Sequence, residues 1–465
     1  MYSVCSVGNS SPLPIAIIGG GITGLAAAHR LARQGRAFRL FESSARPGGN
    51  VRTERHDDGW LIETGPNSLQ LTPAVAALLE ELNLSPLTAS PAAKNRYILR
   101  RGCPVPAPAS PPAFLKSPLF TFSAKLRLFG DLLARPRNRT TDVCLADFIA
   151  SHFGREVVDY GLRPFVSGVY AGDAQKLSAR HSFPTLWEAE RRHGSLIRAQ
   201  LASAKAKRAR GEPSGPPSIF SFTDGLEALP HALAAHLPAG SVEFNARIAD
   251  LTPGNPWKIR WSRSDGGLAP QTEFFSAVIL ALPAAALAAL PIGTMGERPL
   301  ADLAEINYPP VSSLFLGYKR DQVRHPLDGF GMLVPPAENR VPLGVLFNST
   351  LFPGRAPAGH VALTVMTGGA LRPELAHLED DPLLTRVRND LAELLGVSGD
   401  PVFVRRTVWP RAIPQYNLGY ERFLDLIART ETAHPGLLVG GHVRDGISVP
   451  NCLAAGEKLA ARALG

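Results

Sequence analysis

The residues with the clearest chemical meaning are three glycines near the start of the chain. Gly19, Gly21 and Gly24 have G-x-G-x-x-G spacing and directly follow the apolar stretch Ile15–Ile18, which predicts a buried parallel strand. In such a turn the first glycine permits a tight bend. The second lets a pyrophosphate approach the backbone, and the third lets helix and strand pack closely. The helix that follows would offer free N–H groups and the positive end of its dipole to phosphates.

A carboxylate completes this βαβ unit. A second strand, Phe38–Phe41, ends in Glu42, and an acid about 20 residues beyond such glycines can hold ribose hydroxyls. The alternative is a glycine-rich turn that binds nothing, but strand, glycines, helix, strand and acid together predict a dinucleotide site. The residues expected at this site are Gly19, Gly20, Gly21, Ile22, Thr23, Gly24 and Glu42.

The next residues indicate which dinucleotide is bound. The segment from Ser43 to Arg52 resembles the E-x-x-x-R-x-G-G-x-x-R extension of the superfamily of FAD-dependent amine oxidases and protoporphyrinogen oxidases. Arg46 and Arg52 can pair with phosphates, and Gly48-Gly49 can lie against the cofactor. NAD enzymes do not need this second glycine loop, so the expected cofactor is FAD.

The resemblance extends over nearly the whole chain and is closest to the oxygen-dependent protoporphyrinogen oxidases. It is carried by 65–68 (GPNS), 95–97 (NRY), 167–173 (SGVYAGD), 329–335 (GFGMLVP), 344–349 (GVLFNS) and 409–416 (WPRAIPQY). The last flavin loop differs, because His442 stands where the family usually has Asn. The resemblance implies further FAD contacts at Gly65, Pro66, Asn67, Ser68, Ile248, Trp409, Ile447, Ser448 and Val449.

The family's reaction is the six-electron oxidation of protoporphyrinogen IX to protoporphyrin IX, by three hydride transfers to flavin N5. Molecular oxygen is the expected acceptor, with a quinone as the alternative. Cofactors of this kind carry the hard chemistry, so no acid–base dyad, nucleophile or metal ligand set is expected. The resemblance implies an apolar substrate slot formed by Gly168, Leu333, Leu346 and Met366, with Arg96 pairing with a propionate. Without the resemblance, the three apolar side chains would be ordinary core residues and Arg96 a surface ion pair.

Other functions remain open from the sequence. Coproporphyrinogen III, a tetracarboxylate, could be oxidised by the same chemistry and would favour more cationic groups around the slot. More distant alternatives are a carotenoid desaturase, an amine oxidase and a non-enzymatic FAD-binding scaffold.

The expected fold class is α/β. It comprises a discontinuous Rossmann-like FAD-binding domain, a mixed-sheet α+β substrate domain and a helical membrane-associating subdomain. The FAD-binding domain is expected over 1–90, 218–283 and 436–465, the substrate domain over 91–105 and 284–435, and the helical subdomain over 106–217. At 465 residues, two or three domains are the prior expectation.

Composition limits the kinds of partner that the chain is expected to bind and the compartment in which it is expected to work. The net charge of +9 allows a nucleic acid, an acidic membrane or an anionic substrate. The basic run 191–210 lacks interleaved aromatic residues, so nucleic acid is not expected. The four cysteines form no C-x-x-C pair and the first 14 residues lack a basic start, which favours a cytoplasmic protein without a signal peptide. A homodimer is left open.

One segment could contact a membrane. Residues 113–139 mix apolar anchors such as Phe122 and Phe129 with basic residues, and Asp131 is the only acid. Apolar anchors with basic flanks suit a helix lying in an anionic lipid surface. A core-facing helix with a solvated basic face is the equal alternative. The uncharged segment 274–296 is interrupted by Pro283 and Pro291, so it predicts a strand and a helix rather than a membrane span.

Overall fold

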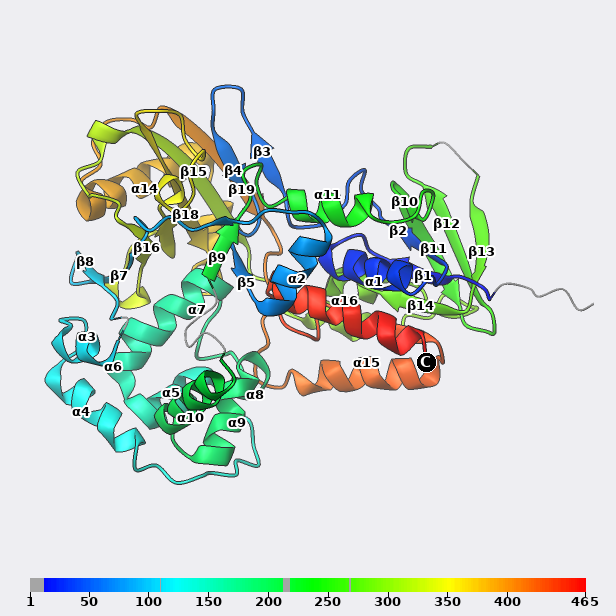
Figure 1. The fold of residues 1–465 in the computed structure, drawn as a ribbon, viewed down its shortest axis with the longest axis horizontal. Coiled ribbons are helices and arrows are strands. Elements are labelled where there is room, and N and C mark those ends of the chain that lie inside the picture. The colour runs from blue at the N-terminus through cyan, green and yellow to red at the C-terminus, as the bar shows by residue number, and fades with distance from the viewer. Residues whose placement is uncertain (1–11, 109, 212–217, 267–268) are drawn as a thin grey trace, which may run out of the picture.

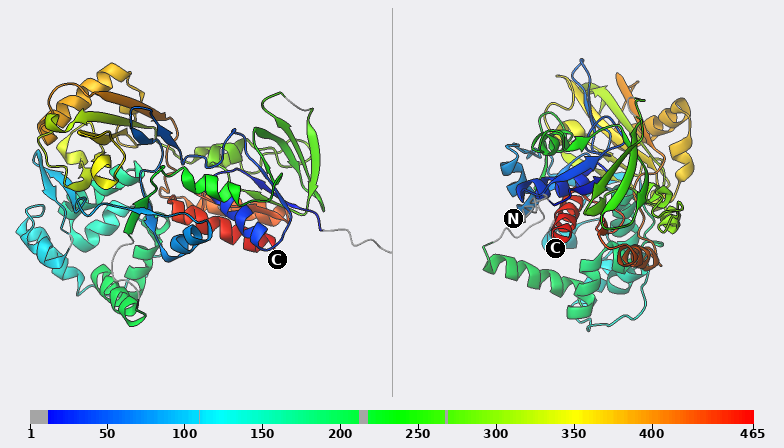
Figure 2. Two further views of the ribbon diagram at one scale, coloured as in Figure 1. Left: turned by 45° about the horizontal axis from the view of Figure 1, so that its top comes forward. Right: turned by 90° about the vertical axis from the view of Figure 1, so that its right-hand side faces the viewer.

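A computed structural model describes residues 12–108, 110–211, 218–266 and 269–465. Most of the N-terminal stretch considered above, including Cys5, lies outside these residues. The described chain forms a nucleotide-binding lobe at one end of its long axis, with a mixed-sheet lobe and a helical lobe at the other (Figures 1 and 2).

The nucleotide-binding lobe is built on a five-stranded parallel sheet in the order β10-β2-β1-β14-β20. Its strands are β1 (Ile15–Ile18), β2 (Phe38–Phe41), β10 (Val242–Glu243), β14 (Ala277–Leu280) and β20 (Leu437–Val439). Segments more than 400 residues apart in sequence thus share one sheet. Every residue of β1, β14 and β20 is buried, as expected for a parallel sheet covered on both faces.

The two faces of this sheet are covered differently, because alternate residues of a strand point to opposite sides. Ile15 and Ile17 pack on the side of α1 (Ile22–Arg33), α11 (Ala228–Ala235) and α16 (Val449–Ala463). Ala16 and Ile18 pack on the side of α15 and a three-stranded antiparallel sheet. Those elements are α15 (Glu421–Ala433), β11 (Ala246–Thr252), β12 (Trp257–Arg263) and β13 (Gln271–Phe275).

The mixed-sheet lobe contains a seven-stranded sheet in the order β19-β15-β18-β17-β16-β7-β8. Its strands are β7 (Asn95–Arg100), β8 (Cys103–Pro106), β15 (Val311–Lys319), β16 (Gly329–Leu333), β17 (Gly344–Leu346), β18 (His360–Gly368) and β19 (Phe403–Trp409). One face packs on α14 (Asp380–Leu395) through Leu383, Val387 and Leu391. On the opposite face, Phe315 and Ala362 pack on Ile62 of β4 (Leu61–Glu63), and Leu333 packs on the helical lobe.

The helical lobe interrupts the other two and lies beside the mixed sheet (Figure 1). Its helices are α3 (Pro111–Lys116), α4 (Phe122–Asp131), α5 (Leu145–Phe153), α6 (Arg155–Val157), the π-helical turn Val158–Leu162, α7 (Arg163–Tyr170), α8 (Ala179–Ser182), α9 (Pro184–His193) and α10 (Leu196–Ala209). A break at Gly194 and Ser195 separates α9 from α10. Gly194 has a φ of +72°, and Ser195 caps α10 by accepting the Arg198 N–H.

Shorter elements connect the lobes. They are β3 (Thr53–Arg55), β4 (Leu61–Glu63), β5 (Leu69–Leu71), β6 (Leu87–Thr88), β9 (Ser218–Ser221), α2 (Pro73–Glu81), α12 (Ala284–Ala289) and α13 (Asn348–Leu351). The uncharged segment around Pro283 forms β14 and α12, as the sequence predicts. In the described ranges, no helix is both long and apolar enough to cross a membrane.

Candidate active site

In the first glycine loop, a side chain would clash with the backbone at two of the three motif glycines and would meet free space at the other. A Cβ on Gly19 would lie 2.5 Å from the Ala281 carbonyl oxygen, and one on Gly24 would lie 1.9 Å from the Gly19 carbonyl oxygen. A Cβ on Gly21 would meet no heavy atom within 4 Å. The loop is therefore locked at its first and third glycines, while free space lies over the second, where a pyrophosphate would approach.

The N-terminus of α1 has no competing acceptor. Gly21 occupies the N-cap position, no side chain caps the helix, and its first turn, beginning with Ile22 and Thr23, contains no acid. Both of those residues are buried. A buried helix start with uncapped N–H groups is a ready anion site, so these residues fit the phosphates of a dinucleotide.

Glu42 lies against the same loop. Its Oε2 accepts the Gly20 N–H at 2.7 Å and its Oε1 accepts the Ser44 N–H at 2.8 Å. The Ser43 hydroxyl lies 3.4 Å from Oε1. Glu42 is buried, so its carboxylate is held at the edge of the loop, where a ribose hydroxyl would be expected.

The second glycine loop pairs directly with the first. The Gly48 N–H donates to the Gly20 carbonyl at 2.8 Å, Gly48 and Gly21 form a parallel bridge, and Gly49 has a φ of +57°. Arg46 supports this loop by donating to the Gly49 carbonyl at 2.8 Å, and it also pairs with Glu227 at 3.2 Å.

The two arginines predicted as phosphate partners therefore differ. The Arg46 guanidinium is committed to loop carbonyls and a carboxylate, whereas the Arg52 side chain is 51% exposed and lies 3.6 Å from Glu54. A phosphate contact remains a prediction for both, and the structure adds a loop-bracing role for Arg46.

The turn from Gly65 to Ser68 is tied to the mixed-sheet lobe. A Cβ on Gly65 would lie 1.9 Å from the Asn50 carbonyl oxygen, so this turn also needs glycine. Asn67 Oδ1 accepts from Asn348 Nδ2 at 2.9 Å, and the Trp409 indole N–H donates to the Thr64 carbonyl at 2.8 Å. Trp409 and the turn, both expected at the flavin, thus lie at one junction between the lobes.

The last loop precedes α16 and is held by tyrosines. The Tyr416 hydroxyl donates to the His442 carbonyl at 2.6 Å and accepts the Gly446 N–H at 3.0 Å. Asp445 Oδ2 accepts the Gly441 N–H at 2.9 Å. Ser448, the N-cap of α16, accepts the Asn451 N–H. The half-buried Ile447, Ser448 and Val449 therefore sit where a rigid loop enters a helix N-terminus.

His442 is neutral at physiological pH. Desolvation by burial lowers the pKa of its imidazole to about 4. Its Nε2 lies 3.1 Å from the Tyr308 hydroxyl, which also accepts the Ala284 N–H at 3.3 Å.

Ile248 lies on β11, directly before an irregularity between Ile248 and Asp250. This strand begins beside Glu42, whose carbonyl accepts the Ala246 N–H at 2.8 Å. The structure thus brings Ile248 to the same end of the lobe as Glu42, consistent with an adenine-side position.

The predicted substrate residues share one face of the seven-stranded sheet. Leu333 and Met366 are both in register with Gly344 of β17, and Leu346 lies two residues beyond Gly344 on that strand. All three side chains are half-buried, whereas Met332, Val345 and Val365, on the opposite face, are in the core under α14. The alternation separates core residues from a row of accessible apolar side chains.

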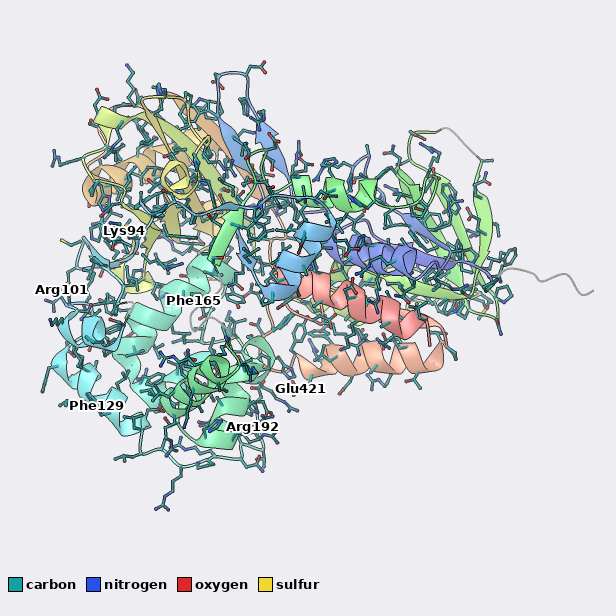
Figure 3. All side chains as sticks on the ribbon, in the orientation of Figure 1. Lys94, Arg101, Phe129, Phe165, Arg192 and Glu421 are labelled. Carbon is teal, nitrogen blue, oxygen red and sulfur yellow. The ribbon has the colours of Figure 1, made fainter. Side chains whose placement is uncertain are left out.

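Gly168 and Arg96 flank this row. A Cβ on Gly168, in α7, would lie 2.5 Å from Leu333 Cδ2, so the helix and the sheet approach closely at this glycine. Arg96 is in register with Gly331, which pairs with Leu346. It is exposed, its guanidinium lies 5.3 Å from the Phe330 ring centroid, and no ion pair engages it within the described residues. Figure 3 shows Phe165, also on α7, between the helical and mixed-sheet lobes.

Sequence reasoning assigned no role to Tyr308, Asn348 or Tyr416. Asn348 and Tyr416 fall in stretches that carry the resemblance, but only the structure shows that they hold the turn at Asn67 and the loop at His442. The sequence places Asn348 and Tyr416 in motifs of the family but does not show what either side chain does.

Comparisons with known proteins were made across the whole chain. The family model described as "flavin containing amine oxidoreductase" matches residues 22–464. The mitochondrial protoporphyrinogen oxidase of Nicotiana tabacum is 33% identical, over 96% of this chain and 94% of the relative. The coproporphyrinogen III oxidase of Bacillus subtilis (strain 168) is 27% identical, over 97% of each chain.

Among solved structures, a putative protoporphyrinogen oxidase from Exiguobacterium sp. 255-15 has the same fold. It superposes with a TM-score of 0.78 at 24% identity, over 98% of this chain and 99% of that one. The expected arrangement of a Rossmann-like parallel sheet with a mixed sheet is therefore confirmed. The matching family is flavin-containing, so the expected flavin cofactor is confirmed as well.

Proposed function

Because this chain belongs to the flavin-containing amine oxidoreductase family, we propose that it is an FAD-dependent porphyrinogen oxidase that converts protoporphyrinogen IX to protoporphyrin IX. The observation that carries the proposal is the sheet face bearing Leu333, Leu346 and Met366, with the exposed cation Arg96 in the adjoining register. Similarity to protoporphyrinogen oxidases over nearly the full length supports it.

FAD fits the residues that the structure brings together. The open backbone at Gly21, the uncapped start of α1 and the Glu42 carboxylate suit the pyrophosphate and ribose. The turn at Gly65 and the loop ending at Ser448 suit the flavin end. When bound, FAD supplies a hydride acceptor at N5, used three times per porphyrinogen, and oxygen reoxidises it.

The chain's own task is to bind and orient the macrocycle. A porphyrinogen is apolar over most of its surface and carries propionates at one edge. Leu333, Leu346 and Met366 offer apolar contact, Gly168 lets α7 approach closely, and Arg96 offers a charged hydrogen-bond donor to a propionate. Positioning of this kind, together with exclusion of water, is the protein's contribution to the rate.

We propose the domain division in the same terms. The FAD-binding domain consists of 1–90, 218–283 and 436–465, the substrate domain of 91–105 and 284–435, and the helical subdomain of 106–217. The parallel sheet supports this division, since its strands come from the three segments assigned to FAD.

Coproporphyrinogen III is the second candidate substrate, because a coproporphyrinogen III oxidase also matches the chain along its length. The two substrates differ in their number of carboxylates, and Arg96 is the one cation assigned to the slot. The test is a side-by-side assay of purified holoprotein with each porphyrinogen under air, following porphyrin fluorescence. We expect kcat/KM to be at least tenfold higher for protoporphyrinogen IX; the reverse preference would assign the protein to coproporphyrinogen.

We further propose that the helical lobe contacts the cytoplasmic surface of a membrane through α3, α4 and the turn after α4. Five apolar side chains there are more than half exposed, namely Leu115, Phe122, Leu126, Phe129 and Leu133. Four of them recur at helical spacing, so they form one stripe, and Lys116, Arg127 and Arg135 are exposed beside it. Such a stripe is unusual on a surface facing only water, and Figure 3 shows Phe129 on the outer side of the lobe.

A further inference from the structure

Three side chains that the proposed reaction does not use converge at the seam between the helical lobe and α15. Asp142 lies three residues before the start of α5, His181 lies in α8, and Glu421 is the first residue of α15. One oxygen or nitrogen of each lies within 4.8 Å of the others, and His181 Nε2 is 3.5 Å from Glu421 Oε2. Figure 3 shows Glu421 at the start of α15, beside the helical lobe.

Two of these atoms are buried without a hydrogen bond. In the described part of the chain, neither Asp142 Oδ2 nor His181 Nε2 has a hydrogen-bond partner. Buried polar atoms are nearly always paired, so each unpaired one calls for an explanation. The other oxygen of Asp142 accepts the N–H groups of Val143 at 2.9 Å and Arg180 at 3.3 Å. These two hydrogen bonds hold the carboxylate in place and leave Oδ2 without a hydrogen-bond partner among the described residues.

We propose that Asp142, His181 and Glu421 bind a divalent transition-metal cation, with Zn²⁺ as the defining case. One imidazole nitrogen and two carboxylate oxygens are a ligand set that Zn²⁺ accepts, with water in the remaining position. Tetrahedral Zn²⁺ with bonds of about 2.0–2.2 Å places neighbouring ligand atoms about 3.4 Å apart. The His181–Glu421 pair already has this spacing.

Glu421 also provides the entry path. Its side chain is 52% exposed, whereas that of His181 is 14% exposed. The carboxylate can therefore rotate to admit a hydrated cation and then close on it. Two carboxylates and a neutral imidazole carry a net charge of −2, which the cation neutralises.

A bound cation would connect the helical lobe to the last flavin loop. A backbone hydrogen bond already crosses this seam, because the Ser178 N–H donates to the Tyr416 carbonyl at 2.8 Å. Tyr420, adjacent to Glu421, donates its hydroxyl to the Val443 carbonyl at 2.8 Å. The cation would thus hold the start of α15, and with it the loop that Tyr420 supports.

The competing explanation is a plain ion pair between a protonated His181 and Glu421, with no cation. Zinc titration separates the two, because an ion pair gives no stoichiometric binding. The holoprotein is stripped with a chelator, desalted and titrated with ZnCl₂ by isothermal titration calorimetry. We expect one Zn²⁺ per chain, with Kd at least tenfold weaker in His181→Gln and Asp142→Asn.

The matched control is His231→Gln, which removes an exposed histidine that also lies beside a glutamate, 3.6 Å from Glu227. It should bind Zn²⁺ like the wild type. Should a buried-site variant fail to fold, the half-exposed Glu421→Gln serves instead. Zn²⁺ should raise the midpoint of thermal unfolding of the wild type but not of Glu421→Gln. Absence of stoichiometric binding, or equal binding by wild type and the three site variants, would overturn the proposal.

Discussion

In the proposed reaction, Arg96 is the residue on which substrate recognition depends most. It is exposed, it pairs in register with Gly331, which in turn pairs with Leu346, and its guanidinium lies 5.3 Å from the centroid of the Phe330 ring. Arg96→Ala should raise KM for protoporphyrinogen about tenfold, equivalent to ~1.4 kcal/mol of lost binding. The FAD content, measured from flavin absorbance, should not change, because Arg96 is not at the dinucleotide.

The control for Arg96 is Arg101→Ala, which removes an exposed cation from the turn between β7 and β8. It should leave KM unchanged. Loss of flavin from Arg96→Ala, or an equal change in KM in both variants, would show that Arg96 does not hold a propionate.

Glu63, two residues before the turn that begins at Gly65, should make stability depend on pH. Burial raises the pKa of its carboxyl to about 7, against hydrogen bonds from Thr53 and Leu226 and the charge of Arg355 3.7 Å away. The raised folded-state pKa means that the unfolded chain releases this proton first, from pH 4.5 upward. Stability therefore falls as pH rises to about 7 and is level above it.

Glu63→Gln should remove this dependence. The midpoint of thermal unfolding of the variant, relative to the wild type, should be higher at pH 8 than at pH 5 by several degrees. An offset that is the same at both pH values would contradict a raised pKa at Glu63.

The sequence could predict the glycine and acid positions because only glycine fits the backbone at Gly19, Gly24 and Gly65. It could not predict that the Arg46 guanidinium would be satisfied by Glu227, since that partner lies 181 residues away. Spacing identifies local geometry well, whereas a long polar side chain can find any of several distant partners.

At the scale of elements, one buried cluster fixes four helices of the helical lobe. His152 in α5 has Nδ1 2.5 Å from Asp131 of α4 and Nε2 3.2 Å from Glu190 of α9. Asp131 also accepts the Ser195 hydroxyl at 2.7 Å and the Ile197 N–H at 3.0 Å, at the start of α10. Although burial opposes it, these bonds hold the pKa of Asp131 below its usual range.

His152→Ala should lower the free energy of unfolding by about 3 kcal/mol, because it removes the residue that bridges the buried carboxylates of Asp131 and Glu190. Urea unfolding followed by circular dichroism measures this change. The exposed pair of Arg191 and Glu188, 2.6 Å apart, is the control, and Arg191→Ala should cost about 0–1 kcal/mol. Equal small losses in both variants would mean that the buried cluster contributes little.

The apolar stripe on α4 should drive salt-sensitive membrane binding. Phe122→Ser with Phe129→Ser should reduce co-sedimentation with anionic liposomes at least fivefold, because two large anchors leave the lipid interface. Leu201→Ser is the control, since Leu201 is 62% exposed but lies on α10, outside the stripe. Unchanged sedimentation of the double variant would exclude α4 as the contact.

The sequence pattern allowed a helix within 113–139 but did not predict which of its faces is exposed. The apolar residues of 113–139 divide between Leu119 and Phe120, which are buried, and Phe122 and Phe129, which are exposed. A helical repeat shows that one face is apolar, and only the packed neighbours decide whether water or protein covers it.

At the scale of the whole molecule, function depends on segments that are distant in sequence. The proposed dinucleotide loops lie at 19–24 and 48–49, the proposed last flavin loop lies at 441–446, and the proposed substrate face comes from strands between 95 and 368. Local patterns established the first βαβ unit. The remaining assembly was predicted through family resemblance, because long-range strand order leaves little trace in local periodicity.

The central claim is that this chain holds an oxidised flavin beside a slot that binds a reduced tetrapyrrole. Anaerobic mixing of the purified protein with one third of an equivalent of protoporphyrinogen IX tests it most directly, because the six electrons of each porphyrinogen reduce three flavins. We predict that the flavin absorbance is bleached while porphyrin fluorescence appears, and that admitting oxygen restores the flavin band. A flavin that stays oxidised in the presence of the porphyrinogen would contradict the claim.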